Sequence, residues 1–350
     1  MAGFGKRVSQ YDEDSISQRP SRYNSHRRTK DRPNFSDAAI GQVVGVDRGR
    51  ITVVVPAGAS HDEQVEVTSV KARELGRKGV VIGDRVRMVG DLSGKPDTLA
   101  RLVEILDRET VLTRTADDSD PIERVIVANA DQMAIVTAIA NPEPRIGLID
   151  RALVAAFEAG LDPILIITKV DLGSPKALLD NYSGMDLRHF LVNQKTGDGI
   201  ESVREALAGH STVFLGHSGV GKSTLVNSLA PDALRVTGTV NDVTGRGKHT
   251  STSARSIPLP SDTGWVIDTP GLRSFGLAHV EPGDIIESFP ELMDGSEECP
   301  RACTHVNAAG DAPPDCALDK WVADGHGGAA GTSRLNSLRR LLVALQTPSS

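Results

Sequence analysis

A glycine-rich segment in the middle of the chain has the spacing of a phosphate-binding loop. Residues 216–224 read GHSGVGKST and fit G-x-x-x-x-G-K-[ST], with a strand-like run before them and a helix-like run after them. Glycines permit a tight turn whose N–H groups face phosphate oxygens, and the helix dipole adds to this. We expect Lys222 to reach the terminal phosphates as a catalytic residue and Ser223 to bind Mg²⁺. The predicted nucleotide-binding residues here are Gly216, His217, Ser218, Gly219, Val220, Gly221, Lys222, Ser223 and Thr224.

A second motif, Thr168-Lys169-Val170-Asp171, follows an apolar run and predicts recognition of the base. The Asp171 carboxylate can accept hydrogen bonds from N1–H and the 2-amino group of guanine, and adenine has neither donor there. Lys169 would pack its stem along the base or the loop. Four matching residues alone are a weak signal, but beside a phosphate-binding loop they favour GTP. A P-loop ATPase is the alternative.

A third motif, Asp268-Thr269-Pro270-Gly271, follows the apolar run WVI and matches the D-x-x-G of nucleotide switches. Asp268 is expected to hold Mg²⁺, and the Gly271 N–H to sense the γ-phosphate. The next residue is Leu272, where many GTPases place a glutamine that orients water. An aliphatic side chain cannot orient water, so either intrinsic hydrolysis is slow or another group does this work.

The polar segment GRGKHTSTSAR (245–255) lies between these motifs and is typical of a mobile switch loop. Thr250 is the expected Mg²⁺-binding hydroxyl, with Ser251 and Thr252 as neighbours that could substitute for it. His249 is a candidate catalytic residue that orients or activates the attacking water. A plain loop histidine is the competing interpretation.

All three cysteines of the chain fall in one short window, as Cys299-x3-Cys303-x-His305-x10-Cys316. Three thiolates and one imidazole are a usual closed tetrahedral set for one structural Zn²⁺, with no open position for catalysis. Unligated thiols are the alternative. An odd, small cysteine count opposes a disulfide framework and suits a reducing cytoplasm. No apolar run approaches membrane-spanning length and no leader pattern is visible, so we expect a cytoplasmic protein that does not bind membranes.

The elements that must position these motifs change type along the chain. Residues 37–116 contain five Val- and Ile-rich strands separated by turns, which predict an all-β OB-fold barrel. Because this barrel lacks aromatic residues from 37 to 112, we do not expect it to bind nucleic acid by base stacking. Residues 117–290 alternate strands and helices and predict a doubly wound parallel α/β domain. Residues 291–350 hold the zinc-binding domain and end in a basic helix, and residues 1–36 predict a disordered basic tail.

Charge is distributed unevenly among these segments. The net charge of −7 combines +4 in residues 1–36 and 0 in 37–116 with −8 in 117–290 and −3 in 291–350. Overall acidity therefore does not exclude a nucleic-acid partner. We expect RNA contacts from the tail, the basic cluster at 70–79 and the helix at 333–345. A solubilising tail and a solvated loop are the competing interpretations.

The order of the motifs is unusual for a GTPase. The guanine motif at 168–171 precedes the phosphate-binding loop at 216–224, and the two switch motifs at 249–252 and 268–271 follow. A standard GTPase places the guanine motif last. The sequence therefore predicts a circularly permuted P-loop GTPase domain, which is possible where chain ends lie close together.

With these motifs the chain resembles the ribosome small-subunit-dependent GTPase A (RsgA or YjeQ) family. VLTRTADDSD, IDRALVAA, TKVDL, GHSGVGKSTLVNSL, GKHTST and DTPGLRSFGL carry the resemblance, with the barrel before them and the Cys/His cluster after them. It implies a GTPase in late maturation of the 30S subunit that binds GTP and GDP, contacts 16S rRNA and is stimulated by the subunit. A monomer is expected. A permuted GTPase acting on the 50S subunit or another RNA is the alternative.

The resemblance also implies roles for single residues. It makes His249 the group that replaces the missing glutamine, and it places the guanine loop at 192–196, where Asn193 joins the nucleotide-binding residues. The family's zinc spacing resembles C-x4-C-x-H-x5-C, so this chain keeps the ligand set with different loop lengths.

Overall fold

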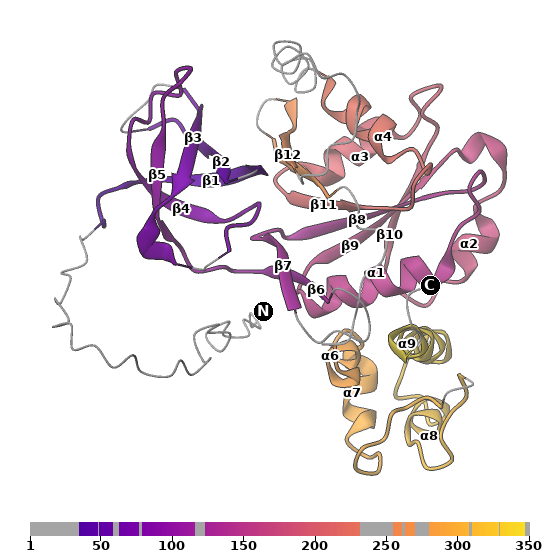
Figure 1. Ribbon diagram of the computed structural model, residues 1–350. Coiled ribbons are helices and arrows are strands. Elements are labelled where there is room, and N and C mark those ends of the chain that lie inside the picture. The colour runs from indigo at the N-terminus through magenta and orange to yellow at the C-terminus, as the bar shows by residue number, and fades with distance from the viewer. Residues whose placement is uncertain are drawn as a thin grey trace, which may run out of the picture.

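The computed structural model describes residues 35–47, 49–58, 63–76, 79–115, 123–231, 255–260, 263–269, 280–307, 310–328 and 330–346. Residues 1–34 of the predicted tail lie outside these ranges, as do His249, Thr250, Ser251, Thr252, Gly271 and Leu272. Figure 1 shows a barrel, a central sheet with helices on its faces, and a group of C-terminal helices below the sheet.

The five predicted barrel strands are present. They are β1 (Ala39–Asp47), β2 (Arg50–Val55), β3 (Val65–Lys71), β4 (Arg85–Gly90) and β5 (Ala100–Ile105). The order is β1-β2-β3-β5-β4, and β4 pairs back onto β1 to close the barrel. Only the β3–β5 pair is parallel, and the interior is filled by aliphatic side chains such as Val43, Val53, Val86 and Leu102. The predicted OB-like barrel is confirmed.

The central sheet is built from six strands in the order β10-β9-β8-β11-β13-β12. Their bounds are β8 (Gln132–Ala138), β9 (Asp162–Thr168), β10 (Arg188–Val192), β11 (Ser211–Leu215), β12 (Arg255–Pro258) and β13 (Trp265–Asp268). The first five strands of that order are parallel, and β12 runs antiparallel at the end. All seven residues of β8 are buried, in agreement with the apolar run Met133–Val136 in its middle.

Helices cover both faces of this sheet. Helix α1 (Ile146–Glu158) packs on the face that carries Met133 and Ile135, whereas α3 (Ile200–Leu207) and α4 (Lys222–Leu229) pack on the face that carries Ala134 and Val136. Successive strand residues point to opposite faces, so one strand supplies both cores. The short helix α2 (Lys176–Asp180) follows β9. The predicted doubly wound fold is confirmed.

A buried junction joins the barrel to the α/β domain. The hairpin of β6 (Val111–Thr115) and β7 (Glu123–Ala128) crosses the predicted boundary at residue 116, which itself stays a prediction. Gly83 has φ +86°, and a Cβ there would lie 1.8 Å from the Ala128 carbonyl oxygen, so only glycine fits this approach. Next to Gly83, the fully buried Asp84 accepts hydrogen bonds from Nε (2.7 Å) and Nη2 (3.0 Å) of Arg108, which lies where the chain leaves the barrel after β5.

A second connection joins the two sheets edge to edge. Strand β12 follows the predicted switch loop, and its Arg255 pairs with Gly45 of barrel strand β1. Through this pair the barrel and the central sheet form one continuous eleven-stranded sheet. The barrel is therefore attached at both the β12 edge and the close approach of Gly83 to Ala128.

The C-terminal segment forms four helices under α1. They are α6 (Pro282–Ile286), α7 (Pro290–Ser296), α8 (Leu318–Ala323) and α9 (Gly331–Gln346). The predicted basic helix is present as α9, but its arginines form ion pairs with carboxylates of the same chain. Arg340 Nε lies 3.1 Å from both carboxylate oxygens of buried Asp150 on α1. Arg339 donates two hydrogen bonds to the Asp319 carboxylate, at 2.8 and 2.6 Å. Arg334 pairs with Glu291 of α7 and with Asp186 of the α/β domain, so Arg340 and Arg334 fix the module to that domain, whereas Arg339 holds α9 to α8. In the described part of the chain, no helix has the length and apolar character needed to cross a membrane.

Candidate nucleotide site and metal cluster

The predicted phosphate-binding loop connects the end of β11 to the start of α4. Gly221 precedes the first helical residue with φ +93°, and a Cβ there would lie 2.6 Å from the Gln194 side chain. The left-handed backbone conformation favours glycine here, and a Cβ would displace the end of the Gln194 side chain. The loop lies at the carboxyl end of the parallel strands, where open α/β sheets bind their ligands.

Lys222 and Asp268 are brought together by the sheet. Parallel pairing aligns Phe214 of β11 with Asp268 of β13, and Lys222 Nζ donates to Asp268 Oδ1 at 2.6 Å. Both side chains are largely shielded, with exposed fractions of 16% and 28%. The predicted catalytic lysine and the predicted magnesium ligand thus share one edge of the sheet.

The donor set at this edge suits a hard cation. The Asp268 carboxylate and the exposed Ser223 hydroxyl, one residue after Lys222, offer the oxygen ligands that Mg²⁺ prefers. The other two predicted partners of this region, Thr250 and Gly271, lie outside the described residues.

The guanine motif is tied to the phosphate-binding loop by side chain to backbone hydrogen bonds. The Thr168 hydroxyl donates to the Val220 carbonyl, and Lys169 Nζ donates to the Gly219 carbonyl at 2.8 Å. Thr168 is fully buried, and Lys169 has a left-handed backbone with φ +55°. The two motifs predicted to read base and phosphates therefore contact each other directly.

Asp171 has a positively charged neighbour that sequence reasoning missed. Lys195 Nζ donates to Asp171 Oδ2 at 2.7 Å and holds the pKa of that carboxyl below its usual range. An ionised carboxylate is the acceptor form that guanine recognition requires.

The loop after β10 lies next to this carboxylate, as expected for the segment that holds Asn193. Val192 pairs with Thr168 of β9, which places the ends of both strands side by side. Asn193 Oδ1 accepts from the Lys195 N–H at 3.1 Å, and Gln194 Nε2 donates to the Gly221 carbonyl at 2.8 Å. Sequence reasoning missed the Gln194 contact, because the loop offered no signal beyond its resemblance.

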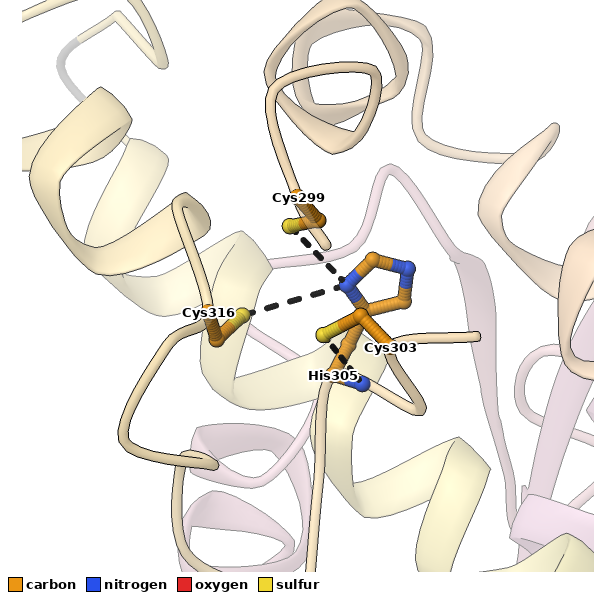
Figure 2. A group of neighbouring side chains, drawn as sticks. All are labelled: Cys299, Cys303, His305 and Cys316. Atoms are coloured by element: carbon orange, nitrogen blue, oxygen red, sulfur yellow. Dashed lines mark hydrogen bonds between the residues drawn. The ribbon is translucent and has the colours of Figure 1, made fainter. Parts of the chain in front are cut away.

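The Cys/His cluster is assembled, as Figure 2 shows. Its four ligand atoms all lie within 4.8 Å of one another. His305 Nδ1 is 3.6 Å from Cys299 Sγ and 3.8 Å from Cys316 Sγ. Tetrahedral bonds of about 2.3 Å to sulfur and 2.0 Å to nitrogen separate such atoms by about 3.6 Å, so the cluster fits a zinc-sized ion.

Two of these thiols also accept hydrogen bonds from backbone N–H groups. The His305 N–H donates to Cys303 Sγ at 3.4 Å, and the Ala317 N–H donates to Cys299 Sγ at 3.3 Å. Burial, with the other two cysteines nearby, raises the pKa of the Cys299 thiol to about 11. Burial, aided by Arg339, lowers the pKa of His305 and keeps the imidazole in its neutral, ligating form. With its pKa raised in this way, the Cys299 thiol would act as a thiolate ligand only beside the charge of a bound cation.

Comparisons with known proteins agree with these features. Residues 105–278 match the model of the RsgA GTPase family. The chain is 38% identical over 299 residues to the small ribosomal subunit biogenesis GTPase RsgA of Pseudomonas syringae pv. tomato, covering 81% of this chain and 82% of the relative. It is also 38% identical over 273 residues to the protein of that name from Pseudomonas putida, covering 76% of this chain and 75% of the relative.

Solved structures show the same fold. YjeQ from Thermotoga maritima superposes with a TM-score of 0.63 and 26% identity, covering 88% of this chain and 98% of that one. YloQ, described as a circularly permuted GTPase, gives a TM-score of 0.59 at 22% identity, covering 94% and 100%. The identity to the curated relatives extends over most of both chains, and the motifs occur in the permuted order on the expected strands. The chain belongs to the RsgA GTPase family.

Proposed function

We propose that this protein hydrolyses GTP to GDP and phosphate and acts in maturation of the small ribosomal subunit. The supporting observation is the contact between the two motifs: Thr168 and Lys169 bind the carbonyls of the loop that ends in Lys222. A base bound by Asp171 would therefore lie beside that loop. The names of the curated relatives support the ribosomal role.

The proposed chemistry assigns each group one task. The loop N–H groups bind the phosphates, and Asp171 binds guanine. Lys222 gives up its hydrogen bond to Asp268 and binds phosphate oxygens instead. Mg²⁺ would be held by Ser223, Asp268 and Thr250 and would neutralise charge between the β- and γ-phosphates. Water attacks the γ-phosphorus while the bond to the bridging oxygen breaks, and GDP leaves. His249 orients that water, and the Gly271 N–H senses the γ-phosphate.

The proposed partners follow from the family. The protein works as a cytoplasmic monomer on the 30S subunit and contacts 16S rRNA, and one Zn²⁺ fills the Cys/His cluster. Because the arginines of α9 are used internally, the RNA contacts are proposed for the tail and for the barrel cluster at 70–79 instead. Arg73 in that cluster is exposed.

The test is the rate of GTP hydrolysis by the full chain with 30S subunits, with 50S subunits and with neither, at one fixed salt concentration. We expect slow hydrolysis by the chain alone, because Leu272 cannot orient water, and acceleration by 30S subunits only. Acceleration by 50S subunits would favour a role on the large subunit. Faster turnover of ATP than of GTP would favour a P-loop ATPase.

Replacement of Lys222 tests the site itself. Lys222→Ala removes the charge expected to stabilise the transferring phosphoryl group, and loss of one such group lowers turnover by about 100-fold or more. Lys176→Ala is the matched control, because Lys176 is exposed and pairs with Asp180 on α2, away from the loop. Phosphate release measures both variants, and unchanged turnover in Lys222→Ala would contradict the assignment.

A further inference from the structure

The side-chain amide of Gln194 lies flat against the last glycine of the phosphate-binding loop. Its Nε2 donates to the Gly221 carbonyl at 2.8 Å. The amide oxygen and nitrogen lie 2.6 and 3.1 Å from where a Cβ on Gly221 would be. Because Gly221 has no side chain, the amide lies beside the backbone of the loop and bonds to it, so Gln194 can influence the direction of its peptide groups.

The carbonyl that Gln194 binds also starts helix α4. Gly221 O accepts the Leu225 N–H at 2.9 Å, so it receives two hydrogen bonds from different directions. In a trans peptide the C=O and N–H groups point in opposite directions. A fixed Gly221 carbonyl therefore fixes the Lys222 N–H so that it points away from the helix, toward the side where a helix N-terminus binds phosphate.

The backbone that carries Gln194 is itself well held. The Asn193 N–H donates to the Asp198 carbonyl at 3.0 Å, and the Gly197 N–H donates to the Asn193 carbonyl at 2.8 Å. The next residue, Lys195, reaches Asp171. One short turn thus touches the phosphate-binding loop with one side chain and the base-reading carboxylate with the next.

We propose that Gln194 is a positioning residue that orders the phosphate-binding loop from the base-binding side. It completes a series in which three consecutive carbonyls, those of Gly219, Val220 and Gly221, accept side chains of the base-binding segments. This inference rests on the proposed nucleotide site and adds a residue to it. Since the contact acts on the loop N–H groups, its contribution to affinity depends on the phosphates that these groups bind.

The test compares GDP with GMP as competitors of a fluorescent GDP analogue on the full chain. Gln194→Ala removes the donor, and Gln194→Glu keeps the length but places an acceptor against a carbonyl oxygen. We expect GDP affinity to fall about three- to tenfold in Gln194→Ala, the range of one neutral hydrogen bond, and further in Gln194→Glu. GMP affinity should change by less than about twofold, because GMP lacks the β-phosphate that the loop binds.

The outcomes separate this inference from the proposed function. An equal loss for GDP and GMP would overturn it, because Gln194 would then act on the base alone, and so would unchanged GDP affinity. Failure of the unaltered chain to bind GDP would instead refute the nucleotide site. Ser202→Ala, at an exposed position on α3, is the control for changes near the turn. Comparing two ligands within each variant also separates the effect from a general loss of folding.

Discussion

Single side chains in the proposed nucleotide site are paired with oppositely charged partners from other elements. Asp171 faces Lys195, and Lys222 faces Asp268. The Lys195 hydrogen bond lowers the pKa of Asp171, so this carboxylate stays ionised as the pH falls from neutral to below the usual carboxyl range. Protonation of Asp171 therefore adds no pH dependence to guanine binding near neutral pH.

Replacement of Asp171 tests base recognition. In Asp171→Asn the amide presents a donor where guanine also has a donor, so we expect GDP affinity to fall by about 100-fold or more. Xanthine has an oxygen in place of the 2-amino group, and its nucleotide should gain affinity in the same variant. Competition binding with GDP and XDP measures both effects. Asp180→Asn, an exposed carboxylate on α2, is the control. Wild-type preference for GDP in Asp171→Asn would show that another group reads the base.

At the scale of elements, the strands were predictable because their signals are local. Valine and isoleucine runs between turn residues give the barrel, and the glycine spacing of 216–221 gives the loop between β11 and α4. The closed order of the barrel agrees with the predicted class, whereas β12 adds an antiparallel strand to a sheet that was predicted to be parallel.

The contacts that were not predictable are hydrogen bonds between distant segments. Gln194 and Gly221 are 27 residues apart, and Arg340 and Asp150 are 190 apart. Neither pair has a periodic signal, because each depends on how whole elements pack. The arginines of α9 illustrate the consequence. The basic helix at 333–345 suggested RNA binding, whereas Arg340 pairs with the buried Asp150 carboxylate. A charge pattern alone does not separate a solvated face from internal ion pairs.

The Cys/His cluster connects α7 to α8 through segments with little other regular structure. Cys299 follows α7, and Cys316 precedes α8. Because metal binding contributes directly to folding in such loops, removal of the ion should loosen this segment. We expect one zinc per chain by metal analysis, and a strong chelator should lower the melting temperature.

Cys303→Ser should abolish the zinc content while leaving nucleotide binding measurable, because the cluster lies apart from the phosphate-binding loop. Thr304→Ala, at an exposed neighbouring position, should keep the metal. A purified chain that contains no zinc and resists the chelator would contradict the assignment.

At the scale of the whole molecule, a buried ion pair lies where the chain leaves the barrel for the α/β domain. Asp84 has no exposed side-chain surface, and Arg108 supplies two hydrogen bonds to it. The Val81 N–H donates to the same carboxylate at 2.8 Å. The segment that leads out of the barrel, and with it the orientation of the barrel, therefore depends on a charge that would be strongly destabilising without its partner. On the proposed function, that orientation decides how the barrel and the nucleotide site meet the subunit together.

Arg108→Ala leaves the Asp84 carboxylate buried without its cation, and we expect it to lower the free energy of unfolding by about 3 kcal/mol. Arg85→Ala is the matched control, because the Arg85–Glu109 pair is exposed at 52% and 75% and should contribute less than about 1 kcal/mol. Urea unfolding measures both values. In hydrolysis assays we expect Arg108→Ala to reduce stimulation by 30S subunits more than the intrinsic rate, because the nucleotide-binding residues lie outside this junction. Equal loss of both rates would instead mean that the junction supports the GTPase fold rather than the placement of the barrel.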